Sequence, residues 1–434
     1  MGMALRVLQV NSADSVGGAE KVGFDLHRAY LQRGLEAWLA VGRKLTGDAS
    51  VLAMSGGPRA GRERWPVARR LIRWARTIRD DARGYESFEH PATWRLLDLP
   101  PARPDILHLH NLHGYYFDLR ALSWLSGQVP TFLTLHDPWL LAGHCAHSFA
   151  CDRWKAGCGQ CPDLSIYPTV RRDATAHNWA VKREIYGRSH VYVATPSRWL
   201  MDRVSVSMLA PAVVEARVIP NGVDLRHFHP ADRAAARAAV GLPRDAKMLL
   251  FAANGIRANP WKDYRTMRAA VAALAERHRG EDLLFVALGE TAPGDRVGQA
   301  EIRFVPFESD PARVACYYQA ADVYLHAAKV DTFPNVVLEA LACGTPVAAT
   351  AVGGIPEQII ENRTGLLTPP GDADAMAAAA RRLLADESLR FRMGSEAVAD
   401  ARRRFSLDRQ VGDYLGWYED VVSRSEHPSR ATSR

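Results

Sequence analysis

Residues 330–372 read VDTFPNVVLEALACGTPVAATAVGGIPEQIIENRTGLLTPPGD, and this segment carries the clearest structural signal in the chain. Just before it, ADVYLHA (321–327) has the apolar pattern of a buried strand. NVVLEALA (335–342) then reads as a helix, and TPVAATA (345–351) as the next strand. A strand that returns through a helix to another apolar strand is typical of a parallel sheet covered by helices.

The same alternation runs along almost the whole chain. Further predicted strands are LRVLQVN (5–11), EAWLAVG (36–42), PDILHLH (104–110), PTFLTLHD (130–137), HVYVATPS (190–197), KMLLFAAN (247–254), DLLFVALG (282–289) and IRFVPF (302–307). Near-continuous apolar strands between helices indicate α/β domains with doubly wound parallel sheets, of the Rossmann-like kind. Ligands of such domains sit beyond the carboxyl ends of the strands, so we expect two domains that face each other across a cleft.

The turn-rich segment VIPNGVDLRHFHPADR (218–233) marks the predicted domain boundary. We therefore predict an N-terminal Rossmann-like domain over 1–220 and a C-terminal Rossmann-like domain over 221–405. A C-terminal helix over 406–424 should pack back toward the first domain. The polar residues 425–434 are expected to be a disordered tail.

Length and composition restrict the class of protein. The 434 residues, with 47% hydrophobic residues and a net charge of +7, suit a globular protein of two domains. No leader pattern and no apolar run of the length needed to cross a membrane is visible, which favours a cytoplasmic location. No nucleic-acid motif accompanies the basic charge, so we expect no nucleic-acid partner.

One segment is strongly basic. RERWPVARRLIRWARTIRDDAR (62–83) has eight arginines and three acids, and a helical wheel separates an apolar stripe from an arginine face. Such a helix suits the anionic inner face of the cytoplasmic membrane, where each basic residue near the surface contributes about 1 kcal/mol. An ordinary surface helix with a solvated arginine face is the alternative.

The loop and helix after the strand that ends near His326 carry two acids, Asp331 and Glu339, eight positions apart. Both carboxylates could point into one cleft, and the backbone of Phe333, Pro334, Asn335 and Val336 would face a polar ligand at the helix start. A carboxylate accepts hydrogen bonds from adjacent hydroxyls, so the pair suits a sugar nucleotide.

These residues resemble the carboxylate–seven–carboxylate signature of the family 4 glycosyltransferases, retaining enzymes of the two-domain GT-B fold. ACGTPV (342–347), the glycines 353–354, NRTGLL (362–367) and the GD at 371–372 match that family in order and spacing. Asp331 replaces the usual glutamate, as in members that resemble colanic-acid or exopolysaccharide transferases, where DTFPN-like sequences occur. The resemblance implies that Glu339 holds the ribose, and that Asp331 with the 333–336 backbone holds the sugar. It also implies that 1–220 is the acceptor-side domain and that 221–405 binds the nucleotide sugar.

The resemblance also assigns roles outside this segment. Arg257 and Lys262 have the spacing of the family's phosphate-binding pair, and Lys262 would stabilise charge on the leaving diphosphate. Gly17 and Gly18 resemble the family's first loop, which faces the donor phosphates. His136, at a strand end, would contact the sugar or the leaving group; of the nearby histidines, His110 or His113 could touch the acceptor. Asp372–Ala373–Asp374 looks like a metal motif, but its place before a helix predicts a cap.

HCAHSFACDRWKAGCGQCP (144–162) contains the cysteines Cys145, Cys151, Cys158 and Cys161. Four thiolates at this spacing can bind one tetrahedral zinc ion, which would be structural because no coordination position stays open. Disulfides, reduced thiols without a ligand, and an iron–sulfur or catalytic metal site are the alternatives. No catalytic metal is expected.

The sequence therefore predicts a bacterial hexosyltransferase. It would retain anomeric configuration and move sugar from a UDP or GDP donor to a lipid-linked or saccharide acceptor in polysaccharide or glycolipid synthesis. Two alternatives stay open: a non-catalytic GT-B partner of another transferase, and a GT-B sugar-nucleotide epimerase.

Overall fold

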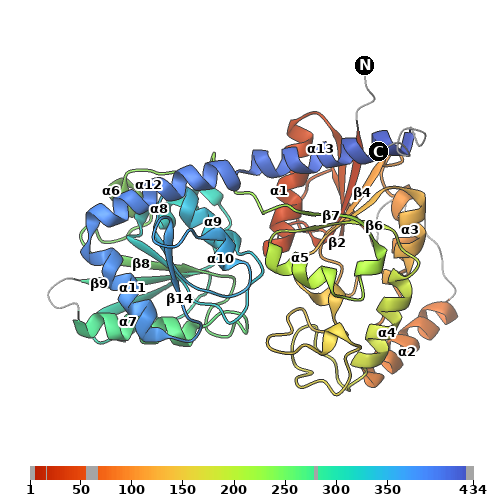
Figure 1. The fold of residues 1–434 in the computed structure, drawn as a ribbon, viewed down its shortest axis with the longest axis horizontal. Helices are drawn as coiled ribbons and strands as arrows, with labels where there is room; N and C mark the ends of the chain where they lie inside the picture. The colour runs from red at the N-terminus through yellow and green to blue at the C-terminus, as the bar shows by residue number, and fades with distance from the viewer. Residues whose placement is uncertain (1–4, 16, 55–66, 278–281, 427–434) are drawn as a thin grey trace. The chain divides into compact units, whose positions relative to one another are not determined.

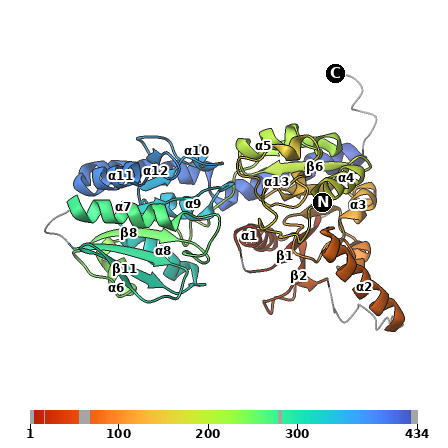
Figure 2. The same cartoon turned by 90° about the horizontal axis from the view of Figure 1, so that it is seen from below.

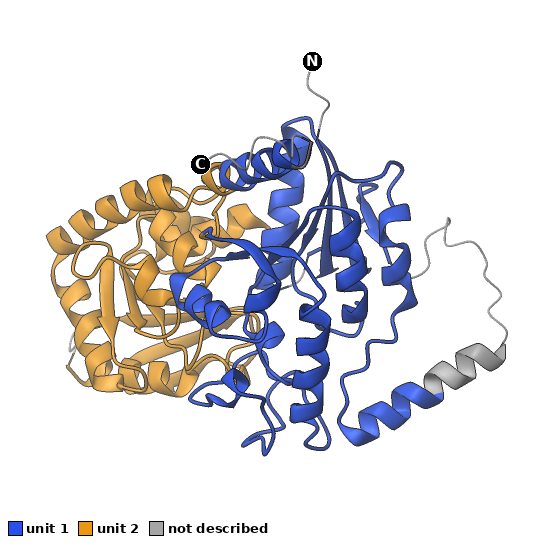
Figure 3. Cartoon of the chain, turned by 45° about the vertical axis from the view of Figure 1, so that its right-hand side comes forward, with its two compact units in different colours: residues 1–219, 411–434 blue, residues 220–410 orange. Residues whose placement is uncertain are grey.

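The computed structural model describes residues 5–15, 17–54, 67–277 and 282–426 (Figure 1). The chain forms two compact units: unit 1 comprises Met1–Ile219 and Val411–Arg434, and unit 2 comprises Pro220–Gln410 (Figure 3). Pro220 and residues 406–410 thus belong to unit 2 rather than to the first domain and the separate helix that we predicted. Backbone hydrogen bonds explain this, because Val223 N–H donates to Phe405 and Leu407 N–H donates to Val223.

Unit 1 is built on a seven-stranded parallel sheet in the order β3-β2-β1-β4-β5-β6-β7. The strands are β1 (Arg6–Ala13), β2 (Glu36–Arg43), β3 (Val51–Ala53), β4 (Ile106–Leu109), β5 (Thr131–Thr134), β6 (Val191–Thr195) and β7 (Val213–Val218). From β1, strands β2 and β3 follow one another toward one edge of the sheet, and strands β4 to β7 follow one another toward the other edge. This is the doubly wound arrangement. In register, Val7 lies opposite both Ala37 and Ile106.

Helices cover both faces of this sheet. They are α1 (Gly18–Gln32), α2 (Val67–Arg83), α3 (Leu122–Gln128), α4 (Thr175–Tyr186), α5 (Arg198–Ser205) and α13 (Leu407–Glu426), with short 3-10 turns η1 (Pro91–Asp98), η2 (Leu119–Ala121), η3 (Trp139–Leu141), η4 (Arg153–Lys155) and η5 (Ala210–Ala212). One hydrophobic core joins Leu8, Leu107 and Leu133 to Leu122 of α3 and Leu200 of α5. On the other face, Trp417 and Tyr418 of α13 pack edge-on against Phe132 of β5. Their ring centroids lie 4.9 and 4.7 Å from that of Phe132.

Unit 2 has a second seven-stranded sheet in the order β10-β11-β9-β8-β12-β13-β14, parallel except for the β10–β11 pair. Its strands are β8 (Lys247–Ala252), β9 (Leu283–Leu288), β10 (Asp295–Val297), β11 (Ala300–Val305), β12 (Val323–His326), β13 (Val347–Thr350) and β14 (Gly365–Thr368). Its helices are α6 (Arg233–Ala239), α7 (Tyr264–Arg277), α8 (Pro311–Ala320), α9 (Asn335–Ala342), α10 (Ile355–Gln358), α11 (Ala373–Ala385) and α12 (Glu387–Arg404).

Alternate side chains of β8 show how the unit 2 sheet is covered. Leu250 points into a core shared with α6, α8 and α9, whereas Leu249 and Phe251 point into a core shared with α7 and α11. Figure 2 shows α7 and α11 on one side of this sheet and α6 and α8 on the other. Both faces are therefore buried, which explains why the strands are apolar throughout.

Among the described residues, no helix combines the length and the apolar composition that crossing a bilayer requires. The part of the predicted basic segment 62–83 from Val67 onward forms α2, and residues 62–66 lie outside the described residues. Of the predicted tail 425–434, Ser425 and Glu426 end helix α13, and residues 427–434 lie outside the described residues. In the part of α2 whose side chains are described, Ala75, Ile78 and Ala82 of the apolar stripe are exposed, as are Arg76, Arg79 and Arg83.

Candidate active site

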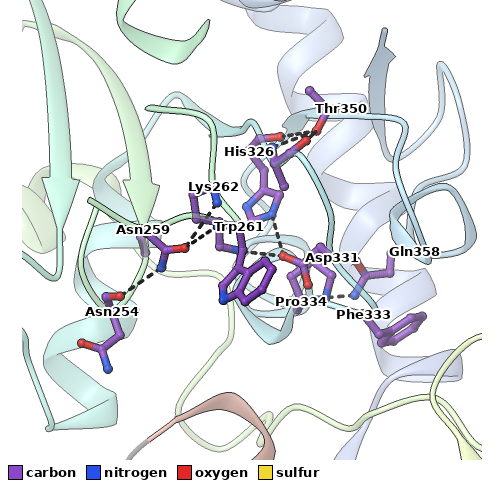
Figure 4. Close-up of polar contacts among 12 residues, drawn as sticks. Asn254, Asn259, Trp261, Lys262, His326, Asp331, Phe333, Pro334, Thr350 and Gln358 are labelled. Atoms are coloured by element: carbon purple, nitrogen blue, oxygen red, sulfur yellow. Dashed lines mark hydrogen bonds and ion pairs between the residues drawn. The ribbon is translucent and has the colours of Figure 1, made fainter. Parts of the chain in front are cut away.

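The ion pair between Lys262 and Asp331 is the centre of the candidate site in unit 2 (Figure 4). Lys262 follows β8 and Asp331 follows β12; the two strands are neighbours in the sheet, so their carboxyl ends bring the two side chains together. The side chains are only 13% and 16% exposed. His326, the last residue of β12, places its Nε2 3.4 Å from the same Asp331 oxygen.

Several hydrogen bonds hold this pair in place. The Asn259 side chain accepts from the backbone N–H groups of Trp261 and Lys262 at 3.0 and 3.3 Å. Asp263 N–H donates to the carbonyl of Ala327 at 3.0 Å, which ties the lysine loop to the end of β12. On the other side, Gly353 has φ +56, and a Cβ there would lie 1.7 Å from the Asp331 carbonyl oxygen, so only glycine fits.

The charges at this site are balanced. Burial alone would raise the pKa of Asp331, but the charge of Lys262 and the hydrogen bond from His326 bring it well below its usual value. Burial also lowers the pKa of His326 to about 4, so this ring is neutral near pH 7. Because an ionised carboxylate only accepts, His326 donates through Nε2, and its Nδ1 lies 3.3 Å from the Tyr324 hydroxyl. The site therefore holds one carboxylate and one ammonium.

Glu339 lies one turn inside α9 and is 7% exposed. The Tyr318 hydroxyl, from α8, donates to its Oε2 at 2.8 Å. Tyr318 is itself anchored, because its carbonyl accepts from the Thr345 hydroxyl at 2.6 Å. The carboxylate is thus oriented by a buried neighbour rather than solvated on a helix surface.

The start of α9 is fixed from outside the helix. Pro334 is the N-cap residue, and no side chain caps the helix. The Gln358 side chain donates to the Pro334 carbonyl at 3.0 Å, and Asn221 Nδ2 lies 3.0 Å from Asn335 Oδ1. Pro334 has no N–H, so the amide donors predicted for the stretch from Phe333 to Val336 cannot include that residue. The positive end of the helix dipole lies here.

Arg257 and Lys262 are paired with different carboxylates. The Arg257 guanidinium contacts Glu290 at 2.5 Å and is half exposed. Glu290 also accepts from the backbone N–H groups of Ile256 and Arg257, both at 2.8 Å. The structure therefore does not bring the Arg257 side chain to Asp331, and its predicted role toward phosphate stays a prediction.

In unit 1, Gly17 and Gly18 lie at the start of α1, as their sequence suggested. Gly17 is the N-cap residue with φ +103, a backbone conformation that disfavours any side chain. Glu20, in the first turn of α1, accepts from the Ser12 hydroxyl and from Asn111 Nδ2, the latter at 3.3 Å. These contacts tie the glycine loop to the ends of β1 and β4.

His136 follows β5, is partly buried, and leads to the two buried histidines His110 and His108. Its Nε2 lies 3.2 Å from Nδ1 of His110, and the His110 ring centroid lies 4.1 Å from that of His108, with the rings tilted by 40°. His108 in turn bonds the Tyr418 hydroxyl of α13 at 2.6 Å and Thr134 at 2.7 Å. Burial lowers the pKa of His136 to about 4 and that of His108 to about 3, so both rings are neutral near pH 7.

The zinc prediction is not supported. In the described part of the chain, no group of three or more Cys, His, Asp or Glu side chains is arranged to hold a metal ion, and all six cysteines are free thiols. Cys158 Sγ accepts from Gly143 N–H at 3.3 Å. Cys161 Sγ contacts His144 Nε2 at 3.3 Å and donates to the Asp163 carbonyl at 3.4 Å. Cys158 and Cys161 thus have separate local partners, and no disulfide joins the cysteines in this structure.

Some residues of the site were absent from our sequence predictions. His326 was noted only as the end of a strand, although a histidine at the carboxyl end of a buried strand could have suggested a role. Tyr318 and Glu290 gave no signal, because they reach Glu339 and Arg257 from elements distant in the chain. Asp372 behaves as predicted and caps α11 by accepting from Ala375 N–H at 2.8 Å.

Comparison with known proteins places this geometry in a family. The profile described as Glycosyltransferase Family 4 matches residues 16–227, and the one described as Glycosyl transferases group 1 matches residues 232–400. The putative colanic acid biosynthesis glycosyl transferase WcaC of Escherichia coli K12 is 27% identical over 360 residues, 80% of this chain and 83% of that protein. A D-inositol 3-phosphate glycosyltransferase of Saccharomonospora viridis is 31% identical over 340 residues, 71% of each chain.

Solved structures share the fold. Anabaena HepE, in complex with UDP and glucose, has a TM-score of 0.63 at 16% identity, covering 96% of this chain and 99% of that one. Sucrose-phosphate synthase of Thermosynechococcus elongatus has a TM-score of 0.63 at 20% identity, with the same coverage. The predicted two-sheet α/β fold is confirmed, and the chain belongs to the family 4 glycosyltransferases of the GT-B fold.

Proposed function

We propose that this glycosyltransferase moves a hexose from a UDP or GDP sugar to a lipid-linked or saccharide acceptor, with retention of anomeric configuration and without a catalytic metal ion. The observation that carries the proposal is the buried Lys262–Asp331 pair beside the start of α9, with Glu339 oriented by Tyr318. A cation, two carboxylates and a helix start match the phosphates, hydroxyls and diol of a sugar nucleotide.

Each group has a separate task in this proposal. Lys262 bonds the diphosphate and stabilises the charge that grows on it as the sugar leaves. Asp331 is then released to accept from sugar hydroxyls, Glu339 accepts from the ribose diol, and the start of α9 faces the donor. Arg257, Gly17, Gly18 and His136 keep the supporting roles that the family resemblance implies. Lys262 supplies positive charge that a metal ion would otherwise provide.

Retention follows if attack and departure occur on the same face of the sugar. The acceptor hydroxyl forms the new bond to C1 while the bond from C1 to the diphosphate oxygen breaks. The proton of that hydroxyl passes to the leaving diphosphate, so no protein nucleophile is needed. Neutral His136 is suited to hydrogen bonding rather than to acid catalysis, because a pKa of about 4 leaves it unprotonated near pH 7.

We also propose that α2 holds the protein on the inner face of the cytoplasmic membrane. Its exposed Ala75, Ile78 and Ala82 are not covered by unit 1, and Ile78 is 47% exposed. Replacing Arg76, Arg79 and Arg83 with glutamine should release the protein from anionic vesicles. The matched control replaces exposed arginines of unit 2 (Arg381, Arg392 and Arg402); equal release by both triple variants would sink the membrane assignment.

The reaction is tested with purified protein, membrane extract and a panel of UDP-, GDP- and dTDP-sugars. UDP-glucose comes first, because HepE has been solved with it. We expect release of nucleoside diphosphate that resists a metal chelator, with retention in the product by NMR. If no donor is consumed, and Lys262→Ala and Glu339→Ala bind nucleotide as well as the parent, the non-catalytic partner is favoured. Conversion of the donor to an epimer without release would favour the epimerase.

A further inference from the structure

A cavity of about 300 Å³ lies within unit 1, beside the end of α2. Its walls come from α2, the segment 84–90, the loop after β4, Trp139 of η3 and residues 168–170. The predicted donor residues of unit 2 are not among its lining. The volume is at the lower end of the range found for small-molecule sites.

The lining is mostly hydrocarbon. Most of the exposed wall surface is apolar, and the apolar side chains include Ile78, Phe88, Leu112, Phe117, Trp139 and Val170. The polar lining residues are Thr77, Asp81, Tyr85, Glu86, Ser87, His90, His113, Tyr115 and Thr169. Phe88, Leu112 and Phe117 are at most 8% exposed, whereas Ile78 is 47% exposed and lies toward the opening. Such a lining favours an apolar ligand, because burying hydrocarbon contributes about 25 cal/mol per Å².

The charged groups in the wall are already bonded within the protein. Glu86 accepts from Trp139 Nε1 at 2.9 Å and pairs with Lys182 at 2.8 Å. Lys182 is fully buried, donates to the Trp139 and Ala142 carbonyls, and lies 3.9 Å above the Trp139 ring. This pair is neutral overall. A saccharide ring would need several convergent polar partners, and these two groups are bonded to one another.

His113, another polar residue of the wall, is also bonded. Its Nε2 pairs with Asp137 at 2.8 Å, and its Nδ1 lies 3.3 Å from the Tyr167 hydroxyl. His113 is one of the two histidines that could touch the acceptor, and Asp137 is the neighbour of His136, so this end of the cavity adjoins the site proposed for transfer. A ligand whose chain fills the cavity would leave its head group on this side of unit 1.

The rim is basic. Arg83 precedes the lining residue Gly84, and Arg171 and Arg172 follow Val170; all three are exposed. Asp81 pairs with Arg171 at 3.2 Å, Asp80 pairs with Arg79, and Asp173 accepts from Cys161 N–H and the Thr175 hydroxyl. The packing there is close, because a Cβ on Gly84 would lie 2.0 Å from the Arg172 carbonyl oxygen. Beyond these pairs, Arg83 and Arg172 add positive charge that favours an anionic head group.

We propose that this cavity binds the hydrocarbon chain of an anionic amphiphile, a lipid phosphate or diphosphate whose head group contacts the arginine rim. Its use as the acceptor-lipid site rests on the proposed transferase function, whereas chain binding does not. The ligand class follows from three features together: an apolar lining, wall charges that are internally paired, and a basic rim.

The proposal is tested by titrating the full chain with decyl phosphate in a calorimeter. The decyl phosphate concentration is kept below its critical micelle concentration. Inorganic phosphate lacks the chain, and decyl maltoside lacks the charge. We expect decyl phosphate to bind at least tenfold more tightly than decyl maltoside, and inorganic phosphate not to bind measurably. Tighter binding of decyl maltoside than of decyl phosphate, or of glucose 1-phosphate than of either, would overturn the proposal and indicate a saccharide site.

Two variants locate the ligand. Val170→Trp fills the cavity, and Ile78→Glu places a charge at its opening. Each variant should therefore lower the affinity for decyl phosphate at least tenfold. The matched control is Val214→Trp, at an exposed position of β7, which should bind like the parent. Circular dichroism confirms folding of each variant. Equal affinity for all four proteins means that the chain binds elsewhere, and the proposal fails.

The proposed function can fail separately. If decyl phosphate binds in the cavity but no donor sugar is consumed, the lipid site stands and the transferase assignment is lost. If Val170→Trp transfers sugar to a water-soluble acceptor, with release of nucleoside diphosphate, at the parent rate and no chain binding is seen, the cavity assignment is lost and the transferase stands.

Discussion

The strand ends of the two units carry different chemistry on the same architecture. In unit 2, the ends of β8 and β12 bring together a buried ammonium and a buried carboxylate, Lys262 and Asp331. In unit 1, the ends of β4 and β5 bring together two neutral rings, His110 and His136. The Asp331 carboxylate keeps its charge beside the Lys262 cation, whereas burial disfavours the charged form of the His110 and His136 rings and leaves them neutral. Equivalent edges of similar sheets can therefore differ in charge.

The largest expected difference between the units is their response to acid. In unit 1, burial lowers the pKa of His27 and His136 to about 4 and that of His108 to about 3; the described part of unit 2 has one such group, His326. Unfolding restores an ordinary pKa near 6.5, so the unfolded chain binds more protons and stability falls as the pH drops from 6.5. Between pH 6.5 and 5 each histidine costs about 2 kcal/mol of unfolding free energy.

Hydrogen exchange at pH 7 and at pH 5, resolved to individual peptides, measures the acid-induced loss of stability in each unit. Protection in β4 and β5 should fall more steeply than protection in β8 and β12. His190→Gln, at an exposed position, serves as the control and should leave the pH dependence unchanged. An equal loss of protection in both units would contradict the contrast drawn between them.

Removing the ammonium of unit 2 should have the next largest effect. Lys262→Ala leaves the Asp331 carboxylate buried without its cation and takes a cation from the leaving diphosphate. We expect turnover to fall about 10²- to 10³-fold, the size seen when one transition-state donor is removed. Lys247→Ala, at the opposite end of β8, is the control. Nucleoside diphosphate release measures both, and similar rates for the two variants would remove Lys262 from catalysis.

The carboxylate on α9 should affect nucleotide affinity. Glu339→Gln keeps the shape of the side chain but loses its charge, and charged hydrogen bonds contribute about 1.5–3 kcal/mol, or about 10- to 100-fold in affinity. Tyr318→Phe removes only the orienting bond, so its effect should be about tenfold or less. Titration calorimetry with UDP and GDP measures both, with Glu276→Gln on α7 as the control. Unchanged affinity in Glu339→Gln would mean that this carboxylate is structural.

A smaller effect is expected from the hydroxyl that joins α13 to the histidines of unit 1. Tyr418→Phe removes the partner of His108 Nδ1 and leaves a buried ring nitrogen unsatisfied, which costs about 1–3 kcal/mol of unfolding free energy. Nucleotide affinity should not change, because the donor residues belong to unit 2. Urea unfolding measures the stability loss, and Tyr115→Phe, 65% exposed, is the control. A matching loss in both variants would show that the bond to His108 is unimportant.

Much of the fold could be predicted because parallel sheets impose a strong local pattern. Apolar strands such as KMLLFAAN and DLLFVALG must be buried on both faces, and the helices between them must cross back over the sheet. Lys262, Asp331 and Glu339 were predictable for a related reason: loops at the carboxyl ends of neighbouring strands converge. The cap at Asp372 depends on four consecutive residues, so it too was visible in the sequence.

Partners distant in the chain explain what the spacing of residues did not predict. Cysteine spacing at 145–161 suggested zinc, but whether thiols converge depends on the path of the intervening loop, and here Cys158 and Cys161 bond different backbone groups. Glu290, from the end of another strand, contacts Arg257 in this structure, and the role of Arg257 toward phosphate stays a prediction.

The amino-acid order alone thus specified the two doubly wound sheets and the family. It also singled out the acids and the lysine that we propose for the donor site, because these predictions depend on periodicity and short spacings. The tertiary structure determined which titratable groups are charged in the folded protein. It placed neutral His326 on Asp331 and Tyr318 on Glu339, linked His136 through His110 and His108 to Tyr418, and closed an apolar cavity around the Glu86–Lys182 pair. The reason is that burial and partner distance, which set pKa values and hydrogen bonds, are properties of the packed chain and not of its local sequence.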